Sequence, residues 1–332
     1  MDPLTHTAMG LFLSRAGLNR WSPRGTAIVM LAANVPDIDI VSAAGGSIGY
    51  LHYHRHLTHS LIAMPVMALL PVLLVRVATR KPIRWLGAYL AALIAVASHL
   101  LLDWTNAYGI RLALPFSGHW FRGDLTGVVD FWIWGICLLG VAGPFLSRLV
   151  GAEISSGAAR DRRHGLGFAV FALTAVFLYD GGRAALHARA VAQLEARLYR
   201  ESAPLRVAAL PSPANPLAWR GLVETGEFYA VADVELAGEF DPARATILRK
   251  AELEPAIEAA SRAPAIQEFL RFAQFPLWRV TPADEPDNAR LVEVFDLRFG
   301  TPQAPGFRAS ALVDSRLQVT KTTFEFGKVR PR

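Results

Sequence analysis

The chain of 332 residues is 52% hydrophobic and contains one cysteine, so a disulfide-stabilised fold is excluded. Long apolar stretches fill residues 1–185, whereas residues 204–332 have the composition of an ordinary soluble domain. The net charge of +6 comes with basic residues gathered in short loops between the apolar stretches. This pattern is typical of membrane topology and argues against nucleic-acid binding.

Five apolar segments in the first 185 residues are long enough to cross a bilayer, which takes about 20 residues. A shorter apolar helix is predicted over residues 5–18. Together these elements predict an α-helical membrane bundle of five to six segments. The expected spans are residues 25–43, 61–79, 85–103, 128–147 and 165–184.

An amphipathic helix over residues 186–203 is predicted to connect the bundle to a soluble α+β domain over residues 204–332. Alternation of apolar and polar residues in that domain predicts an antiparallel sheet, with a helix near residues 251–273. The expected strands are residues 227–236, 276–281, 290–299, 306–314 and 316–326.

The lysine and arginine positions predict the orientation of the bundle, because basic loops stay in the cytoplasm. The basic loops are residues 15–24, 76–84 and 148–163. We therefore expect a multi-pass membrane protein whose domain over residues 204–332 is extracytoplasmic.

Four clusters of histidine and carboxylate residues stand at the ends of the apolar segments, and the predicted orientation places them on the outer face. Ionisable groups beside membrane spans are costly and therefore usually functional. Histidine with carboxylate is also the ligand set of a hydrolytic metal ion. The clusters are DPLTH (2–6), PDID (36–39), HRHLTHS (54–60) and HLLLD (99–103).

The last cluster has the spacing of a ligand pair. His99 and Asp103 are four residues apart, so a helix places both on one face. The alternative is a helix-end histidine beside a surface aspartate. Asp130, near the start of the span 128–147, faces the same side and is a further candidate for the site.

The HRHLTHS cluster offers His54 and His59 as imidazole ligands, with Thr58 able to orient a ring nitrogen. Arg55 could hold a phosphate or carboxylate group of a substrate. Ser60 lies near the N-terminus of the next helix, where backbone N–H groups favour an anion. The alternative interpretation is a polar loop at the membrane interface.

The two remaining clusters contain three carboxylates. Asp37 and Asp39 repel each other unless a cation lies between them, which predicts ligand or general-base roles. The alternative is that Asp37 caps a helix. Asp2 before Pro3 starts a helix, and His6 follows one turn later as either a metal ligand or a packed histidine.

The combined motifs D-x-x-T-H, P-D-x-D, H-R-x-x-T-H-S and H-x-x-x-D followed by N-x-Y-G resemble those of the bacterial and archaeal membrane-bound metal-dependent hydrolases, some of them LexA-regulated. The resemblance covers roughly residues 1–150 and implies a hydrolase of the bacterial inner membrane. His56 occupies a variable position of the pattern. The matching positions are Asp2, Thr5, His6, Asp37, Asp39, His54, Arg55, Thr58, His59, Ser60, His99 and Asp103.

We therefore expect a metal-dependent hydrolase of an ester or phosphoester at the outer membrane interface, because a divalent ion acidifies water for attack. The position of the site beside the bilayer favours a membrane lipid or a lipid-linked substrate. Asp37 and Asp39 would serve as ligands or base, and Arg55 would stabilise developing negative charge. One or two ions, Zn²⁺ or Mn²⁺, would be held by His6, His54, His59, His99 and Asp103.

Two non-enzymatic alternatives use the same residues. The chain could be a metal-stapled scaffold that presents residues 200–332 to a partner, or a metal or proton transporter. Transport sites usually lie near the bilayer midplane, whereas these clusters lie near the span ends. A scaffold would tolerate the loss of Arg55, and an enzyme would not.

Overall fold

The computed structural model describes residues 1–154, 165–283 and 288–326. The chain forms two compact units that alternate along the sequence. Part of the basic loop 148–163, on which the predicted orientation rests, lies outside the described residues. The first unit comprises Met1–Asp39, Arg55–Ala188 and Pro211–Ala218, and the second comprises Ile40–His54, Arg189–Leu210 and Trp219–Arg332.

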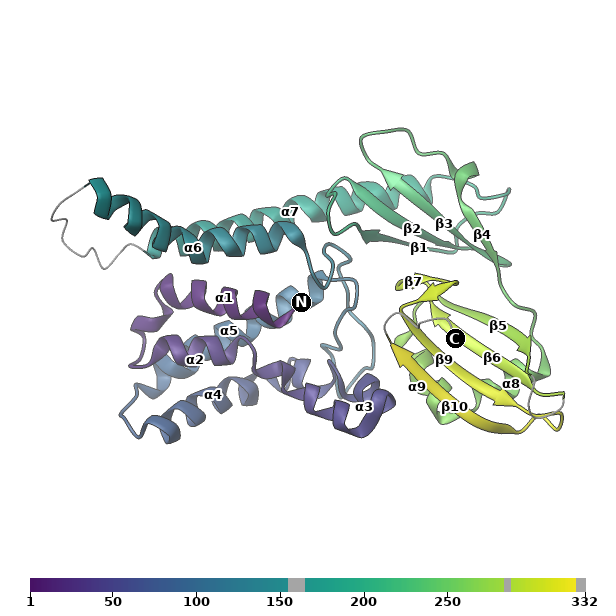
Figure 1. The fold of residues 1–332 in the computed structure, drawn as a ribbon, viewed down its shortest axis with the longest axis horizontal. Coiled ribbons are helices and arrows are strands. Elements are labelled where there is room, and N and C mark those ends of the chain that lie inside the picture. The colour runs from purple at the N-terminus through teal and green to yellow at the C-terminus, as the bar shows by residue number, and fades with distance from the viewer. Residues whose placement is uncertain (155–164, 284–287, 327–332) are drawn as a thin grey trace. The chain divides into compact units, whose positions relative to one another are not determined.

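Helices build the first unit (Figure 1). The Asp2 carboxylate caps the first of them by accepting hydrogen bonds from the backbone N–H groups of Leu4 and Thr5 at 3.1 Å, as the Asp-Pro start predicts. Short 3-10 helices η1 (Leu18–Arg20), η2 (Val35–Gly45) and η3 (Leu57–His59) connect the longer elements. The α-helices are α1 (Pro3–Arg15), α2 (Gly25–Ala32), α4 (Met64–Thr79), α5 (Trp85–Thr105), α6 (Phe131–Ile154) and most of α7 (Leu166–Glu195).

Three helices in the described part of the chain are long and apolar enough to cross a membrane, namely α5, α6 over Phe131–Leu149, and α7. Helix α2 and the stretch Val35–Tyr53 are bent by 47° at their break, and as a pair they would make a fourth crossing. The break precedes Pro36, which disfavours helix at Val35. The helical membrane region is confirmed, but the count of five to six spans is not, because α4 has only 16 residues and the 25–43 segment is broken.

Small and β-branched side chains fill the contact between α2, α4 and α5. Alanines recur every three or four residues along α5, so that one face of this helix allows close approach of its neighbours. This packing brings the end of α2 within hydrogen-bonding distance of α5, where the candidate site lies. The buried residues are Ile28, Val29, Ala32, Ala33, Ala68, Val72, Val75, Ala88, Ala91, Ala92, Ala95 and Val96.

A segment that follows α7 in sequence completes the first unit. Arg183 of α7 is 1% exposed and donates a hydrogen bond to the backbone carbonyl of Pro216. Trp132 of α6 donates from its indole nitrogen to the carbonyl of Ala214 at 3.0 Å. The helices are therefore tied to a short stretch, Pro211–Ala218, that belongs to the same unit.

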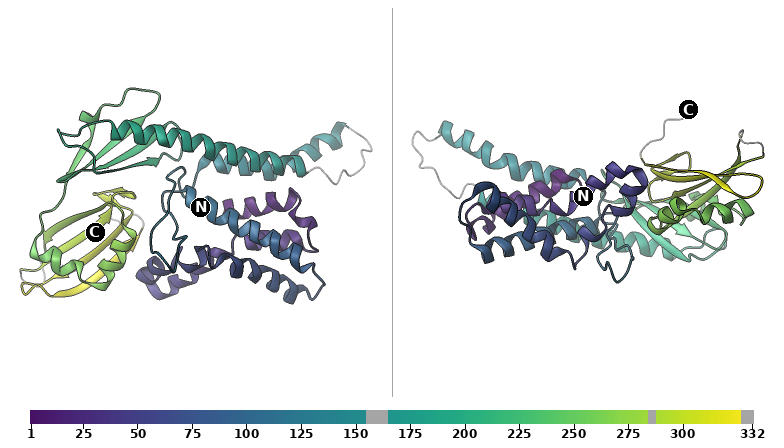
Figure 2. Two further views of the ribbon diagram at one scale, coloured as in Figure 1. Left: turned by 180° about the vertical axis from the view of Figure 1, so that it is seen from behind. Right: turned by 90° about the horizontal axis from the view of Figure 1, so that it is seen from below.

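The second unit contains two four-stranded sheets, in the orders β1-β2-β3-β4 and β10-β9-β6-β5 (Figures 1 and 2). The pair β3–β4 and every neighbouring pair of the second sheet are antiparallel. Helix α3 (Gly46–Tyr53) also belongs to this unit. The strands are β1 (Arg206–Pro211), β2 (Ala218–Glu224), β3 (Phe228–Glu235), β4 (Thr246–Arg249), β5 (Pro276–Pro282), β6 (Arg290–Asp296), β9 (Phe307–Val313) and β10 (Val319–Phe326), with a small hairpin of β7 (Gly300–Thr301) and β8 (Ala304–Pro305).

Helices α8 (Pro255–Ser261) and α9 (Pro264–Phe272) pack on the second sheet, and α9 does so through aromatic side chains. Phe269 lies 5.8 Å from Phe324, and Phe272 lies 5.2 Å from Phe307, between ring centroids. The predicted α+β class and all five expected strands are confirmed. The helix expected near 251–273 is two helices, because Pro264 begins a new one. Residues 186–195 of the expected connecting helix are the end of α7.

Candidate metal centre

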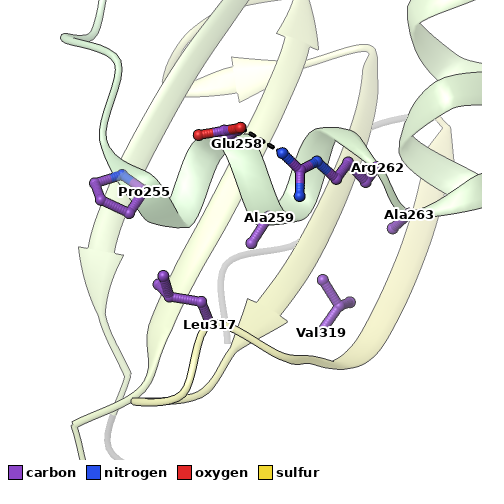
Figure 3. A pocket seen from close by; sticks show the side chains of 7 residues that line it. All are labelled: Pro255, Glu258, Ala259, Arg262, Ala263, Leu317 and Val319. Atoms are coloured by element: carbon purple, nitrogen blue, oxygen red, sulfur yellow. Dashed lines mark hydrogen bonds and ion pairs between the residues drawn. The ribbon is translucent and has the colours of Figure 1, made fainter.

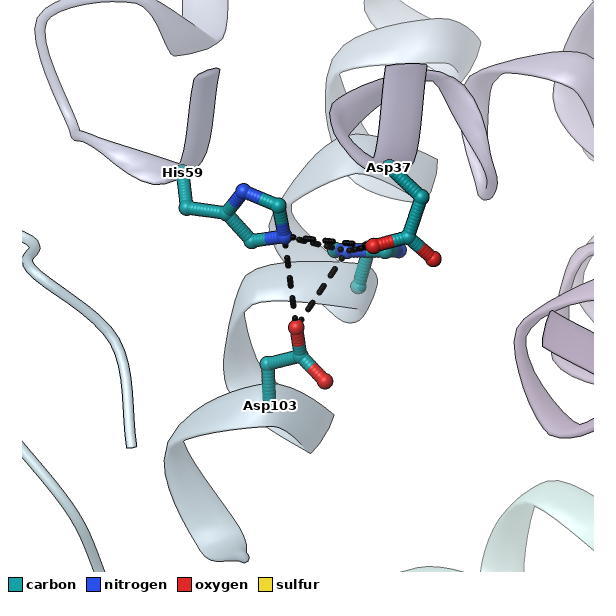
Figure 4. Close-up of side chains that lie close together, drawn as sticks. Asp37, His59 and Asp103 are labelled. Atoms are coloured by element: carbon teal, nitrogen blue, oxygen red, sulfur yellow. Dashed lines mark hydrogen bonds and ion pairs between the residues drawn. The ribbon is translucent and has the colours of Figure 1, made fainter. Parts of the chain in front are cut away.

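Four side chains from distant parts of the first unit converge on one point. Asp37, His59, His99 and Asp103 each offer one ligand atom, and these atoms all lie within 4.8 Å of one another (Figure 4). The two histidines and Asp103 are fully buried, whereas the side chain of Asp37 is 22% exposed. The group therefore has one accessible side, at Asp37.

His99 is oriented by the end of α2. Helix α2 ends at Ala32, so the carbonyl of Ala33 has no partner within the helix. The Nδ1 atom of His99 lies 2.8 Å from this carbonyl oxygen, which can only accept a hydrogen bond. Nδ1 therefore carries the proton, and in the neutral imidazole Nε2 presents a lone pair.

His59 is oriented in the same way by a carboxylate. Its Nδ1 atom lies 3.2 Å from Oδ2 of Asp39 and 3.0 Å from the hydroxyl of Thr58, and Thr58 donates to the same Asp39 oxygen at 3.0 Å. A proton on Nδ1 satisfies Asp39 and leaves Nε2 as the free electron pair of the ring. Such a carboxylate–histidine pair is the usual outer support of a metal-binding imidazole.

The four ligand atoms bring like charge together. The Nε2 atoms of His59 and His99 are 3.1 Å apart. Oδ2 of Asp103 lies 3.3 and 3.5 Å from these nitrogens, and Oδ1 of Asp37 lies 3.4 and 3.6 Å from them. Oδ2 of Asp103 has no hydrogen-bond partner among the described residues. A cation between these atoms removes the repulsion, and two carboxylates favour a divalent metal over a shared proton.

Arg55 neutralises the other oxygen of Asp103. Its guanidinium donates to Oδ1 of Asp103 at 2.9 Å, to Oδ1 of Asn106 at 3.1 Å and to the carbonyl of Gly109 at 3.1 Å. Asn106 in turn accepts from the backbone N–H of Tyr108 at 2.9 Å, which closes the turn. The amino group of Met1 also contacts Oδ1. Oδ2 of Asp103 is therefore the oxygen that faces the imidazoles.

His6 lies against the group without being one of the four. Its ring stacks on His99 with centroids 3.8 Å apart, and its Nε2 is 3.3 Å from Oδ1 of Asp103. Neither ring nitrogen has a hydrogen-bond partner among the described residues. Burial, followed by the neighbouring His99 ring, holds the pKa of His6 well below the ordinary imidazole value, so the ring is neutral.

The other predicted site residues have local partners. His54 stacks on Tyr50 at 4.5 Å and is not in the four-residue group. The hydroxyl of Ser60 donates to the carbonyl of Leu57 at 2.7 Å and so closes the turn before α4. Besides capping α1, Asp2 accepts from the indole of Trp134 at 3.0 Å.

Asp130 serves the start of α6. It accepts from the backbone N–H groups of Trp132 at 3.0 Å and Ile133 at 3.2 Å, as a capping residue does. The hydroxyl of Tyr179 donates to the same carboxylate at 3.1 Å. Asp130 is not in the four-residue group found among the described residues.

Sequence reasoning missed two supports of the site. The Ala33 carbonyl carries no residue-specific pattern, although Pro36 marks the end of α2 and so the presence of unpaired carbonyls nearby. Asn106 was recognisable as a turn residue in NAYG, but its bond to Arg55 joins positions 51 residues apart.

Loss of the Asp39 carboxylate is expected to weaken metal binding without abolishing it. In Asp39→Ala the His59 ring loses the acceptor that fixes its tautomer, and outer-shell substitutions of this kind typically cost about 10–100-fold in affinity. Competition with a chromophoric chelator measures the change. Asp241→Ala, which removes a 52% exposed carboxylate from the second unit, is the matched control. Equal affinity in both variants would contradict the role given to Asp39.

A shallow pocket of about 380 Å³ lies elsewhere, on the second unit (Figure 3). An ion pair between Glu258 and Arg262, four residues apart in sequence, lies along one side of it, and no histidine or cysteine is among its lining residues. It therefore lacks the ligand set of the group around His59 and His99. The lining residues are Pro255, Glu258, Ala259, Arg262, Ala263, Leu317 and Val319.

Comparison with known proteins places the first part of the chain in a membrane protein family. The family model described as "YdjM inner membrane protein" matches residues 1–185, which is more than half of the chain. The chain belongs to the YdjM inner membrane protein family. This confirms the resemblance drawn from the motifs, and with three candidate spans it identifies a membrane protein.

The C-terminal part matches a second family model, the "YfhP C-terminal alpha/beta plait domain", over residues 255–328. The "Uncharacterized protein YfhP" of Bacillus subtilis (strain 168) is 30% identical over 139 residues, or 39% of this chain. The chain spans 42% of the length of that relative. No solved structure matches the chain.

Proposed function

We propose that the chain is a membrane-embedded, metal-dependent hydrolase of an ester or phosphoester. The observation that carries the proposal is the meeting of two imidazole nitrogens and two carboxylate oxygens within 4.8 Å, with one of the two aspartate side chains partly exposed. A structural site fills every coordination position of its ion with protein ligands, whereas a catalytic site leaves one position for water or substrate.

The division of roles follows from burial. His59, His99 and Asp103, all fully buried, would hold a single ion, and Zn²⁺ or Mn²⁺ suits such a mixed nitrogen and oxygen set. When bound, the ion supplies Lewis acidity that polarises a substrate oxygen and lowers the pKa of water. Asp37, with its side chain 22% exposed, would take a proton from an attacking water.

Arg55 and Asp39 contact the proposed ligand residues without being ligands themselves. Arg55 is 3% exposed and directs its charge to Asp103, so it orients a ligand and keeps the second oxygen of that carboxylate occupied. Asp39 holds the proton on Nδ1 of His59. Both residues would therefore orient the ligand atoms, whereas Asp37 would contact the substrate.

The surroundings support a lipid or lipid-linked substrate. Ile38 next to Asp37 is 51% exposed, and Leu61, two residues after His59, is 57% exposed. Exposed apolar side chains beside a polar group suit a molecule with an acyl chain and a polar head. His99 and Asp103 lie in the last two turns of α5, near the end of a candidate span, which supports an interfacial site over a transport site at mid-membrane.

The same proposal includes a multi-pass arrangement in the inner membrane, with the second unit outside the cytoplasm. It is supported by the three candidate spans and by the basic loop 76–84, which precedes the span that ends at the site.

Removal of the metal is expected to abolish hydrolysis. The full chain, purified in detergent, would be analysed for its elements and then assayed on lipid esters and lipid phosphoesters before and after treatment with a chelator. Activity should vanish with the metal and return with Zn²⁺ or Mn²⁺, because the ion supplies the Lewis acid. Protein free of metal as purified and inert to added metal would refute the proposal. Stoichiometric metal without hydrolysis of any substrate would favour a metal-stapled scaffold.

A further inference from the structure

Two residues that support the metal centre, Asp39 and Arg55, flank a segment that belongs to the second unit. Residues Ile40–His54 belong to the second unit, whereas Asp39 before them and Arg55 after them belong to the first. The backbone N–H of Arg55 donates to Oδ2 of Asp39 at 2.8 Å, so the two ends of the excursion are bonded to each other. We call Ile40–His54 the α3 segment.

The α3 segment is held by the C-terminal sheet and its helix α9. The hydroxyl of Ser47 donates to the carbonyl of Phe324 in β10 at 2.9 Å. Nδ1 of His52 lies 2.9 Å from Oε1 of Glu268 in α9. The ring of Tyr50 stacks on a phenylalanine at the end of β10, with centroids 5.5 Å apart. Three kinds of contact therefore fix one short helix to the plait domain.

The two residues that flank the α3 segment act directly on the ligands. Asp39 is the acceptor that orients His59, and Arg55 is the cation that orients Asp103. Arg55 also has a φ of +52°, a left-handed conformation that is unfavourable for a residue with a Cβ and persists only when its surroundings hold it. A displacement of the α3 segment therefore acts on both supports of the metal centre together.

We infer that the C-terminal plait domain regulates the metal centre through the α3 segment. Its contacts with Ser47, Tyr50 and His52 set the distance between Asp39 and Arg55, the residues on either side of the α3 segment. These two residues in turn orient His59 and Asp103. The inference rests on the proposed metal function for its consequence, but the mechanical link is present in the chain whether or not an ion is bound.

The test loosens the grip without touching a site residue. In the full chain in detergent, Ser47→Ala, Tyr50→Ala and His52→Ala are combined, and Glu268→Ala is made separately from the other side of the contact. The matched control is Glu258→Ala, which breaks an exposed ion pair with Arg262 in the neighbouring helix α8.

Two measurements are made on each variant, namely hydrogen–deuterium exchange of the peptide over residues 55–60, and the Kd for Zn²⁺. Loosening should raise amide exchange in that peptide, since the Arg55 N–H loses its fixed acceptor. It should also raise the Kd by about 10-fold, the low end of outer-shell effects. The control should change neither quantity, and His52→Arg, which keeps an N–H group for Glu268, should behave as the wild type.

The outcomes separate the inference from the proposed function. If the wild type binds Zn²⁺ and the loosened variants bind and exchange as it does, the regulatory inference is overturned and the proposed function stands. If the wild type binds no metal, the proposed function fails, and exchange over residues 55–60 alone decides the inference. Should the triple variant lose its fold, Glu268→Ala gives the decisive comparison.

Discussion

Asp103→Asn is expected to lose its metal almost completely, with affinity falling by more than about 100-fold, because it removes a ligand where outer-shell changes alone cost about 10–100-fold. The amide keeps one oxygen for Arg55, which donates to Oδ1 at 2.9 Å, but replaces the oxygen that faces the two imidazoles. The amide N–H groups would occupy the Nε2 lone pairs of His59 and His99, and the amide nitrogen itself does not bind a metal ion. Elemental analysis of the purified variant measures the effect.

The asparagine is preferred to alanine for a physical reason. Asp103→Ala would remove a hydrogen-bond acceptor of the buried Arg55 guanidinium, whereas the amide oxygen of asparagine keeps one, and an unsatisfied buried donor costs about 1–3 kcal/mol. Loss of metal in the alanine variant could therefore reflect unfolding. Asp241→Asn, in an exposed position, serves as the control for the amide substitution. Full metal content in Asp103→Asn would remove Asp103 from the ligand set.

Asp37→Asn is expected to separate binding from chemistry. General acid–base groups contribute about 10²–10⁴-fold to rate, so kcat should fall by that amount. Metal content should largely persist, because three buried ligand atoms remain. The measurement is the initial rate of lipid ester or phosphoester hydrolysis, normalised to bound metal.

Two results would change the role of Asp37. A variant with unchanged kcat would show that another group takes the proton. A variant that loses its metal as completely as Asp103→Asn would show that Asp37 is a metal ligand. Another group would then have to serve as the general base.

The candidate site was predictable where local spacing determines geometry. His99 and Asp103 are a helical i, i+4 pair, so their common face followed from the chain alone. Asp37 and His59 were recognised by residue type in their clusters, and the structure brings both to the same point. The absence of His54 from the four-residue group was not predictable, because a change of unit falls directly after it, between His54 and Arg55.

The fold was predictable where periodicity is strong. Hydropathy marked α5, α6 and α7, and alternation marked the strands of the C-terminal sheet. The strands β1, β2, β4, β7 and β8 were not predicted. Strand β4, for example, has only four residues, which is too short for an alternating pattern to be recognised. The docking of residues 40–54 on β10 joins positions more than 270 residues apart, and no local pattern encodes it.

The first unit cannot form all its hydrogen bonds until Pro216 has been synthesised, because Arg183 of α7 donates to the Pro216 carbonyl. The guanidinium is sealed from solvent and is bonded to the carbonyl of Pro216, which leaves the ribosome 33 residues later. Until then the Arg183 guanidinium lacks one of its acceptors. Translation of α7 alone therefore does not complete the unit that carries the proposed metal ligands. A gene fragment that stops at residue 185, where the family match ends, lacks Pro216 and therefore this hydrogen bond.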